Sequence, residues 1–422
     1  MLGAASAALL VAAVAVGLRP ASLPGTSGSL RHEAYVWQRN WTIHVQKAID
    51  QAVPPLDGLV CLGAEVRIRN GQPRAVRVSP DYRALAAKKV PIGVALRIGP
   101  YRGPFSEEGG LADFLADQAS SLIAEARAEG LEPSEIQIDF DCTEADLDGY
   151  CLWLRAIRRK APSLPVIVTA LPCWLKRAAF ARLAVEAGGY VLQVHSLERP
   201  KGPDEPAQLC DAAAARRAVE RAGRIGVPFR VALPTYGYVL AFGRGGRFLG
   251  LSAEGPMAAW GPAVRLCELR ADPAAMAALV QGWTENRPAC MSGIVWYRLP
   301  VGSDALNWRW PTLSAVIAGR APVAALRAEL RRPEPGLVEV DLVNCGEADG
   351  ALPAAVPVSW AGGELLAADA VGGFELGIGA PGSARFTAQR GVPGGQLPPG
   401  ARRMIGWLRF GADPEVQVRV AQ

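Results

Sequence analysis

The sequence predicts a (β/α)8 TIM barrel followed by a small all-β sandwich. Between about residues 33 and 300, eight short runs rich in Val and Ile alternate with helical patterns, and most runs are bounded by Gly or Pro. After about residue 320 the runs are strand-like, with Gly/Pro turns and no helical pattern between them. We therefore expect the barrel over residues 29–320 and the sandwich over residues 321–422. An open doubly wound sheet is the alternative, but no strand is followed by a Gly-rich phosphate loop.

The barrel strands are predicted from β-branched and aromatic residues in short runs. Residues 65–79 alternate around Asn70-Gly71, which predicts a hairpin inserted after the second strand. The eight predicted barrel strands cover residues 33–39, 58–66, 91–99, 135–141, 165–172, 190–196, 229–238 and 292–300. The strand-like runs of the sandwich cover residues 337–350, 355–363, 374–379 and 405–410.

The helices between the strands have recognisable ends. Asp272-Pro273 predicts an N-cap followed by Pro at the first helical position, and Gly130 suits the C′ position of the preceding helix. Thr143 to Asp146 has the spacing of a capping box. The predicted helices cover residues 111–129, 147–160, 174–187, 211–225 and 273–286.

The N-terminus predicts export. Residues 2–18 carry no charged side chain and are rich in Ala, Val and Leu, and small or turn-forming residues follow in 20–29. This pattern is typical of a secretory signal peptide or a short membrane anchor, although no Lys or Arg precedes the apolar run. We expect residues 1–28 to direct the protein to the periplasm or cell envelope, either cleaved or kept as an anchor.

Composition excludes several classes of partner. The chain is 50% hydrophobic and carries a net charge of only +5, with no basic run that would indicate nucleic-acid binding. Eight cysteines are present without a CxxC spacing, so neither a zinc site nor any other metal or cofactor is expected. Cys142 and Cys173 would follow adjacent strands and are one candidate disulfide, with free buried thiols as the alternative. We expect a monomer.

The stretch 135-EIQIDFD-141 places polar groups on one face of a strand. Ile136, Ile138 and Phe140 share one face, whereas Gln137, Asp139 and Asp141 share the other. Barrel enzymes carry their chemistry at the C-terminal ends of the strands, so this polar face is expected to point into the barrel mouth. The same reasoning adds residues from five other strands: Glu65, Arg97, Gln193, His195, Tyr236, Trp296 and Arg298.

Carboxylates, amide donors and aromatic rings together favour a sugar ligand. Asp141 is the candidate general acid, and Asp139 would orient it or stabilise positive charge at the sugar. Glu65 would be the second carboxylate of an inverting mechanism if the two carboxyl groups lie about 6.5–9.5 Å apart. The candidates for substrate contact are Gln137, Gln193, His195, Tyr236, Trp296, Arg97 and Arg298.

Each of these residues also has a structural interpretation. Asp141 precedes a predicted helix and would be favoured by the helix dipole alone. Arg97 could be a structural partner of Asp139, since a buried carboxylate is costly unless it is paired or functional. His195 and the aromatic residues could belong to the core. A single His among oxygen ligands is a poor transition-metal site.

Four of the predicted strands resemble glycoside hydrolase family eighteen, the chitinases. 229-FRVALPTYGY-238 is similar to its strand seven, 165-PVIVTALP-172 to strand five, and 292-SGIVWYR-298 to strand eight, whose Trp floors the sugar subsite. 135-EIQIDFD-141 resembles the D-x-x-D-x-D-x-E signature and implies Asp141 in the position of the catalytic Glu; another register places Thr143 there. The family's M-x-Y-D on strand six corresponds here to Gln193, His195 and Ser196, so the residues that assist an acetamido group are missing.

The whole chain resembles a bacterial family catalogued as domain of unknown function 3142. The similar segments are 34-AYVWQRNWT-42, 135-EIQIDFDCTEADLDGYCLWL-154 and 341-DLVNCGEAD-349. The resemblance implies an exported, glycosidase-type barrel. We therefore expect a glycoside hydrolase-like enzyme acting on an extracellular or cell-envelope polysaccharide. The alternative is a non-catalytic glycan-binding or scaffold protein built on a degenerate glycosidase barrel, and it is favoured if Asp141 caps the helix at Thr143.

Overall fold

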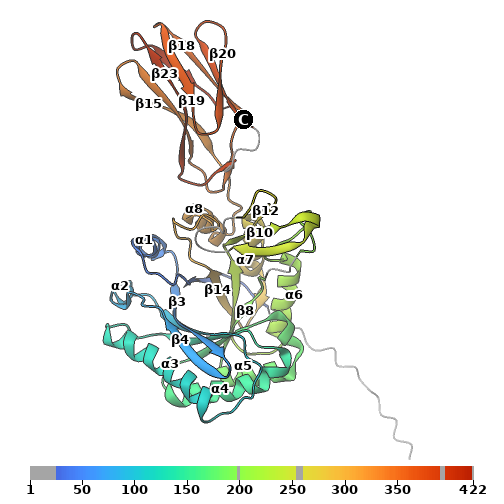
Figure 1. Cartoon of the computed structure of the whole chain (residues 1–422). Helices are drawn as coiled ribbons and strands as arrows, with labels where there is room; N and C mark the ends of the chain where they lie inside the picture. Colours follow the sequence, from blue (N-terminus) through green and yellow to red (C-terminus); the bar gives the residue numbers. More distant parts are fainter. Residues whose placement is uncertain (1–24, 197–199, 253–259, 390–394, 421–422) are drawn as a thin grey trace, which may run out of the picture.

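A computed structural model describes residues 25–196, 200–252, 260–389 and 395–420. Its first part is a closed parallel barrel, which confirms the predicted fold class (Figure 1). Each strand pairs with its neighbour in chain order, and the β2–β3 and β2–β14 pairings close the ring. The eight parallel strands of this part of the chain are β2 (Arg31–Val36), β3 (Gly58–Arg69), β5 (Ile92–Ile98), β6 (Glu135–Phe140), β7 (Val166–Ala170), β8 (Tyr190–Gln193), β9 (Phe229–Pro234) and β14 (Met291–Tyr297).

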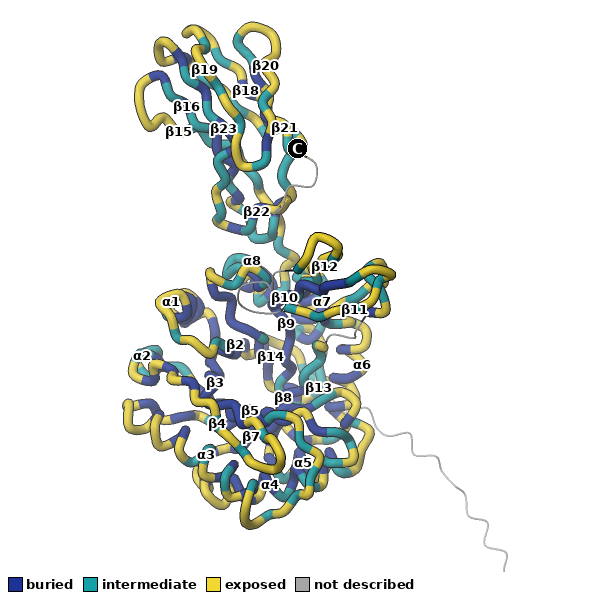
Figure 2. Tube along the Cα trace, viewed as in Figure 1, coloured by how far each residue is buried: buried dark blue, intermediate teal, exposed yellow. Residues whose placement is uncertain are grey.

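Helices surround the barrel and bury the outward faces of the strands (Figure 2). Ile136, Ile138 and Phe140 of β6 lie in this outer core, as their spacing predicts. A smaller core fills the barrel itself and includes Val60, Ala95 and Val191. The helices are α1 (Ile43–Ala52), α2 (Tyr82–Ala86), α3 (Gly110–Ala128), α4 (Leu147–Lys160), α5 (Ala178–Ala187), α6 (Ala212–Gly223), α7 (Pro273–Glu285) and α8 (Trp310–Ile317), with 3-10 turns η1 (Glu144–Asp146), η2 (Pro172–Lys176) and η3 (Arg244–Gly246).

The helix ends follow the sequence signals with one exception. The Asp272 carboxylate accepts hydrogen bonds from the amides of Ala274 and Ala275, and Pro273 is the first residue of α7. The capping box predicted at Thr143 is wrong, because the 3-10 turn η1 precedes α4 and the Thr143 hydroxyl donates to the Asp146 carboxylate instead of capping an amide.

Two strand insertions extend the barrel. The predicted hairpin forms between β3 and β4 (Gln72–Arg77), with Asn70 and Gly71 both at positive φ. The predicted strand 229–238 is instead two strands, because the chain leaves the barrel after Pro234 and starts a three-stranded antiparallel sheet. We call it the inserted sheet; it consists of β10 (Gly237–Phe242), β11 (Phe248–Ser252) and β12 (Arg265–Arg270).

The C-terminal part is a sandwich of two four-stranded antiparallel sheets around its own core. Val340, Phe386 and Leu408 are fully buried between the sheets. One sheet contains β15 (Leu326–Glu334), β16 (Leu337–Asn344), β23 (Arg402–Phe410) and β19 (Leu365–Ala370). The other contains β20 (Phe374–Ile378), β21 (Ser383–Ala388), β18 (Ala355–Ala361) and β24 (Glu415–Val418), while β17 (Gly350–Ala351) pairs with β22 (Gln396–Leu397).

The sandwich lies on the side of the barrel that carries α8 and the inserted sheet (Figure 1). Polar contacts of one loop join the two parts: the Thr312 hydroxyl donates to the Glu347 carbonyl at 2.5 Å, and Arg270 pairs with Asp349 at 3.2 Å. The segment 341–349 therefore includes the residues through which the sandwich contacts the barrel.

The N-terminal segment expected to direct export lies mostly outside the described residues. From Gly25 onward the chain belongs to the folded structure, because β1 (Gly25–Thr26) pairs with β13 (Arg287–Pro288). Within the described ranges, no helix has the length and apolarity needed to cross a bilayer. All eight cysteines are free thiols, so Cys142 and Cys173 are not bridged.

Candidate active site at the barrel mouth

Three charged residues lie side by side at one level of the barrel. Glu65 is the register partner of Arg97 on the next strand, and Arg97 is the register partner of Asp139 on the strand after that. A bulge places Glu65 on this level: between Leu62 and Ala64, β3 has one residue more than β5, and that residue is Gly63. The bulge reverses the inside–outside alternation, so Leu62 and Glu65 both face inward while Ala64 packs against the helices.

Asp139 is held in place by three donors. Its Oδ1 accepts a hydrogen bond from the Thr169 hydroxyl at 2.8 Å and from Gln193 Nε2 at 3.3 Å, and Arg97 Nε lies 3.7 Å from Oδ2. Asp139 is only 7% exposed. Because the donors fix the carboxylate in orientation, Asp139 is suited to a supporting electrostatic role rather than to movement during a reaction.

Asp141 has different surroundings. It is exposed to solvent, and it makes no hydrogen bond with any residue that the structure describes. The pKa of Asp141 is raised to about 6, because the surrounding protein shields the carboxyl from bulk water and the charge of Asp139 lies nearby; Arg97 opposes this rise. Carboxyl groups with a raised pKa are candidates for acid–base chemistry.

Glu65 is buried in a bidentate ion pair. Arg39 Nη2 lies 2.7 Å from Oε1 and Arg39 Nε lies 3.1 Å from Oε2, so both carboxylate oxygens are engaged. A carboxylate held in this way is a poor base for a water molecule. The geometry therefore favours a structural role for Glu65 and does not favour the two-carboxylate mechanism with Asp141.

Aromatic rings occupy the other side of the mouth. Tyr297 stacks on His195, with ring centroids 5.2 Å apart and planes 20° apart. The same Tyr297 ring makes edge contacts with Tyr236 at 5.5 Å and with Trp37 at 5.6 Å. The cluster lies at the ends of β2, β8, β9 and β14. Trp37 and Tyr236 are buried within it, at 3% and 4% exposure, whereas Tyr297 and His195 are partly exposed.

Several polar atoms in this region have no partner among the described residues. They are Nε1 of Trp37, Nε1 of Trp41, Nε2 of His195 and Oε1 of Gln38. The other ring nitrogen of His195, Nδ1, lies 3.3 Å from the Tyr236 hydroxyl, and burial lowers the pKa of His195 to about 4. His195 is thus neutral at physiological pH, and all four unpartnered atoms are buried.

The structure shows where three further candidate residues lie. Trp296 faces outward and is fully buried between His32 and Trp308, because β14 presents Val295 and Tyr297 to the barrel interior and not Trp296. Arg298 is 4% exposed and pairs with Asp304 at 2.5 Å, which holds the loop after β14. Gln137 points inward as predicted but lies below the mouth, where it is fully buried and accepts a hydrogen bond from the Tyr35 hydroxyl at 2.7 Å.

Three residues of the mouth were not among the sequence candidates for substrate contact or catalysis: Tyr297, Thr169 and Arg39. Thr169 could have been found, because it is the polar residue of 165-PVIVTALP-172 and faces inward like Ile167. Whether Tyr297 points into the mouth depends on which face of β14 is turned inward, and alternation alone does not determine that. Arg39 lies in a loop and has no periodic signal.

A cleft of about 1060 Å³ adjoins the mouth between three segments. These are the loop from β2 into α1, the inserted sheet, and the segment that follows β14. Arg39 belongs both to this cleft and, through Glu65, to the charged row of the mouth. Asp139 and Asp141 do not line the cleft itself. In the described part of the chain, no group of His, Cys, Asp and Glu is arranged to hold a metal ion.

Family models match both parts of the chain. Residues 111–302 match the family described as Domain of unknown function (DUF3142). Residues 327–411, within the sandwich, match a second family, Domain of unknown function (DUF8456). The DUF3142 match covers strands β6 to β9 and β14, and therefore includes both Asp139 and Asp141.

Solved structures similar to this chain include a spore cortex-lytic enzyme and chitinases. The spore cortex-lytic enzyme SleL of Bacillus megaterium is 15% identical, with a TM-score of 0.49 over 70% of this chain and 75% of that one. A chitinase from Chromobacterium violaceum is 14% identical, with a TM-score of 0.47 over 69% and 98%. The GH18 chitinase ChiB of Flavobacterium johnsoniae is 13% identical, with a TM-score of 0.45 over 69% and 94%. No curated protein sequence matches the chain.

Proposed function

We propose that the mouth of the DUF3142 barrel hydrolyses a glycosidic bond in an extracellular or cell-envelope polysaccharide, with Asp141 as the general acid. The observation that carries this proposal is the pair of carboxyl groups with unlike surroundings. Asp141 is accessible and its pKa is raised to about 6, whereas Asp139 beside it is fixed by Thr169, Gln193 and Arg97. Two nearby carboxyl groups in different environments are the usual requirement for acid catalysis at a sugar.

The reaction uses these groups in defined roles. Protonated Asp141 donates its proton to the glycosidic oxygen while the bond from that oxygen to the anomeric carbon breaks. The negative charge of Asp139 stabilises the positive charge that develops on the sugar ring. Water then adds its hydroxyl to the anomeric carbon, and its proton restores the acid form of Asp141.

The aromatic side of the mouth supports binding of the sugar. Tyr297 is partly exposed and presents ring surface, and the buried rings of Trp37 and Tyr236 pack against it. His195 is partly exposed and neutral, so its ring borders the site without adding charge. The apolar N-terminal segment would bring the protein to the compartment that holds such a polysaccharide.

A non-catalytic glycan-binding protein is the second candidate. It is favoured if Asp141 caps the helix that follows β6. The structure supports the hydrolase instead, since the residue before η1 is Thr143 and Asp141 makes no hydrogen bond with that turn.

The direct test is release of reducing ends from a panel of bacterial polysaccharides by the purified chain and by its Asp141→Asn and Asp139→Asn variants. We expect release by the wild type and a loss of about 100-fold or more in Asp141→Asn with sugar binding retained. Glu144→Gln is the matched control, because Glu144 lies three residues further along and pairs with Arg177 at the surface. Equal rates in wild type and Asp141→Asn, or binding with no release by any form, would contradict the proposal.

A further inference from the structure

Each side of the cleft beside the mouth contributes apolar side chains, next to the uncharged polar residues Gln38, Asn40, Thr42, Ser252 and Ser303. α1 contributes Val45, and the inserted sheet contributes Val239 and Leu266. The segment after β14 contributes Val301, Ala305 and Leu306. Leu266 is 43% exposed, so its side chain is accessible to a ligand in the cleft.

The charged residues of the cleft are already paired within the protein. Arg39 binds Glu65, Arg298 pairs with Asp304 at 2.5 Å, and Arg270 pairs with Asp349 at 3.2 Å and also with Glu268. A charged ligand would therefore have to compete with existing ion pairs. The lining is instead complementary to an uncharged ligand with both apolar and hydroxyl-bearing parts.

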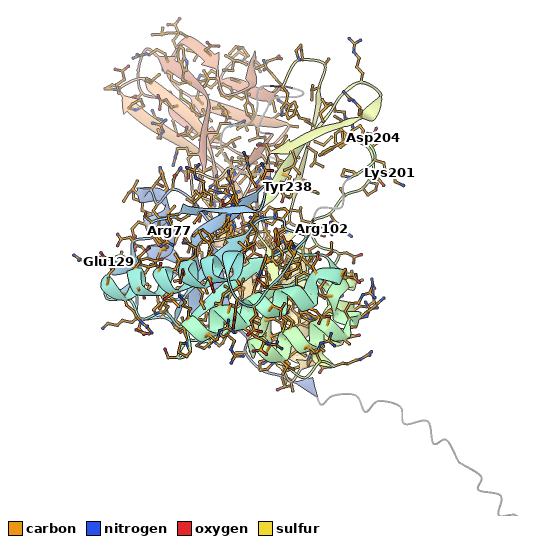
Figure 3. All side chains as sticks on the ribbon, turned by 60° about the horizontal axis from the view of Figure 1, so that its bottom comes forward. Arg77, Arg102, Glu129, Lys201, Asp204 and Tyr238 are labelled. Carbon is orange, nitrogen blue, oxygen red and sulfur yellow. The ribbon has the colours of Figure 1, made fainter. Side chains whose placement is uncertain are left out.

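Strand register shows that one face of the inserted sheet forms the wall. Leu266 is the partner of Ala241, which lies on the same face as the cleft residue Val239. Leu251 is the partner of Leu240 and lies on the opposite face. That opposite face meets the loop after β8, where Asp204 pairs with Arg265 at 2.6 Å (Figure 3).

The cleft and the mouth share a residue, so a single ligand can reach both. Arg39 lines the cleft, and its guanidinium holds Glu65 in the row that continues through Arg97 to Asp139. Gln38, the residue before Arg39, also lines the cleft. The cleft volume, about 1060 Å³, is at the upper end of pockets that hold drug-sized ligands.

We infer that this cleft binds a fatty-acyl chain carried by the glycan, so that the substrate class is an acylated glycan whose sugar lies in the mouth and whose chain lies against Leu266 and Val239. The inference rests on the proposed function for the position of the sugar. The inference adds the class of glycan that the protein selects, which the proposed function leaves open.

Alkyl glycosides test the inference through binding alone. Affinities of the purified full chain for ethyl, butyl, hexyl and octyl β-D-glucopyranoside are measured by isothermal titration calorimetry below the critical micelle concentrations. We expect binding to tighten about two- to fourfold per added methylene, with a heat capacity change that becomes more negative as the chain lengthens. Because the readout is binding, it gives a result even if the protein hydrolyses no polysaccharide.

Two exposed leucines on opposite faces of the inserted sheet give a matched comparison. Leu266→Ser is expected to weaken the dependence of affinity on chain length. Leu251→Ser changes a side chain of similar exposure (47%) and is expected to leave that dependence unchanged. No dependence on chain length in the wild type, or equal dependence in both variants, would overturn the inference. Failure of polysaccharide release with this pattern intact would overturn only the proposed hydrolysis.

Discussion

At the scale of single residues, Asp139 and Asp141 show how two positions on one strand acquire different chemistry. The side chain of Asp139 lies where neighbouring strands β5, β7 and β8 supply donors, so its charge is matched by Arg97, Thr169 and Gln193. Asp141 lies one residue beyond the end of β6, above those donors. The barrel mouth shields the Asp141 carboxyl from bulk water, but the donors that bind Asp139 do not reach it. The pKa of Asp141 therefore rises.

The pH dependence of hydrolysis follows from this pair. A general acid must be protonated to donate its proton. The rate is therefore expected to be constant below about pH 6 and to fall above it as Asp141 loses its proton. Asp139→Asn removes the negative charge that raises the pKa of Asp141, so the residual activity should fall at a lower pH. Arg97→Gln removes the opposing positive charge, so the fall should move to a higher pH.

The measurement is kcat/KM against pH for the wild type and both variants. Arg102→Gln is the control, because Arg102 is exposed and pairs weakly, at 3.9 Å, with Asp146 instead of Asp139. Shifts of both variants in the same direction would show that Asp141 is not the titrating group.

Tyr297 and Trp296 are neighbours with opposite roles. Tyr297 faces the mouth, so Tyr297→Ala is expected to raise KM about tenfold or more while the protein stays folded. Trp296 is fully buried against the helices and donates to His32 Nδ1 at 3.2 Å, so Trp296→Phe should lower stability by about 1–2 kcal/mol without changing KM. Steady-state kinetics and urea unfolding of the two variants separate these outcomes, and a KM change in Trp296→Phe alone would reverse the assignment.

The direction of the side chains on β6 was predictable because apolar and polar residues alternate along this strand without interruption. Ile136, Ile138 and Phe140 require one face to be buried, which leaves Asp139 to the barrel. On β14 the sequence offers Val295 and Tyr297 on one face and Ile294 and Trp296 on the other. Both sets are apolar enough to be core, so only the closed barrel determines that Tyr297 faces inward.

At the scale of elements, the bulge in β3 determines which side chain enters the mouth. The extra residue is Gly63, and a Cβ there would lie 2.5 Å from Leu122 Cδ2 and 2.9 Å from Val94 Cγ1. Glycine thus allows α3 to pack closely against the bulge.

Gly63→Ala is expected to destabilise the protein by about 1–3 kcal/mol, because Leu122 and Val94 must move. Chemical denaturation measures the loss. Gly282→Ala is the control: Gly282 lies in α7, and no described atom outside its own helix backbone and chain neighbours comes within 4 Å of the place that an added methyl group would take. That change should therefore be neutral or stabilising by about 0.5–1 kcal/mol. Equal stability of the two variants would show that the bulge is not tightly packed.

The eight barrel strands were predictable because each is a short β-rich run with a breaker at its ends. The inserted sheet was missed because β9 and β10 are separated only by Thr235 and Tyr236, so the two strands read as one run. The turn at Thr143 was misread for a related reason: a capping-box spacing does not distinguish an α-helix from a 3-10 turn that precedes one.

At the scale of the whole molecule, the redox state of the cysteine thiols bears on the prediction that the protein is exported. Cys173 and Cys345 are exposed, whereas Cys61, Cys142 and Cys151 are buried. We expect a maleimide to label Cys173 and Cys345 first in the native protein without reductant, as mass spectrometry of peptides would show. Labelling of Cys173 only after reduction would instead indicate a bridge to Cys142, the pairing that the sequence left open.

The barrel divides its mouth into two halves that come from different stretches of chain. Charged groups come from the consecutive strands β3, β5 and β6, whereas the aromatic rings and the apolar cleft come from β8, β9, the inserted sheet, β14 and β2. Because Arg39 links the two halves from outside the inserted sheet, exchanging residues 237–270 for another insertion would leave Glu65, Arg97, Asp139 and Asp141 untouched. New ligand preferences are therefore accessible to such proteins through recombination of one segment, and protein engineers have the same route for retargeting this scaffold.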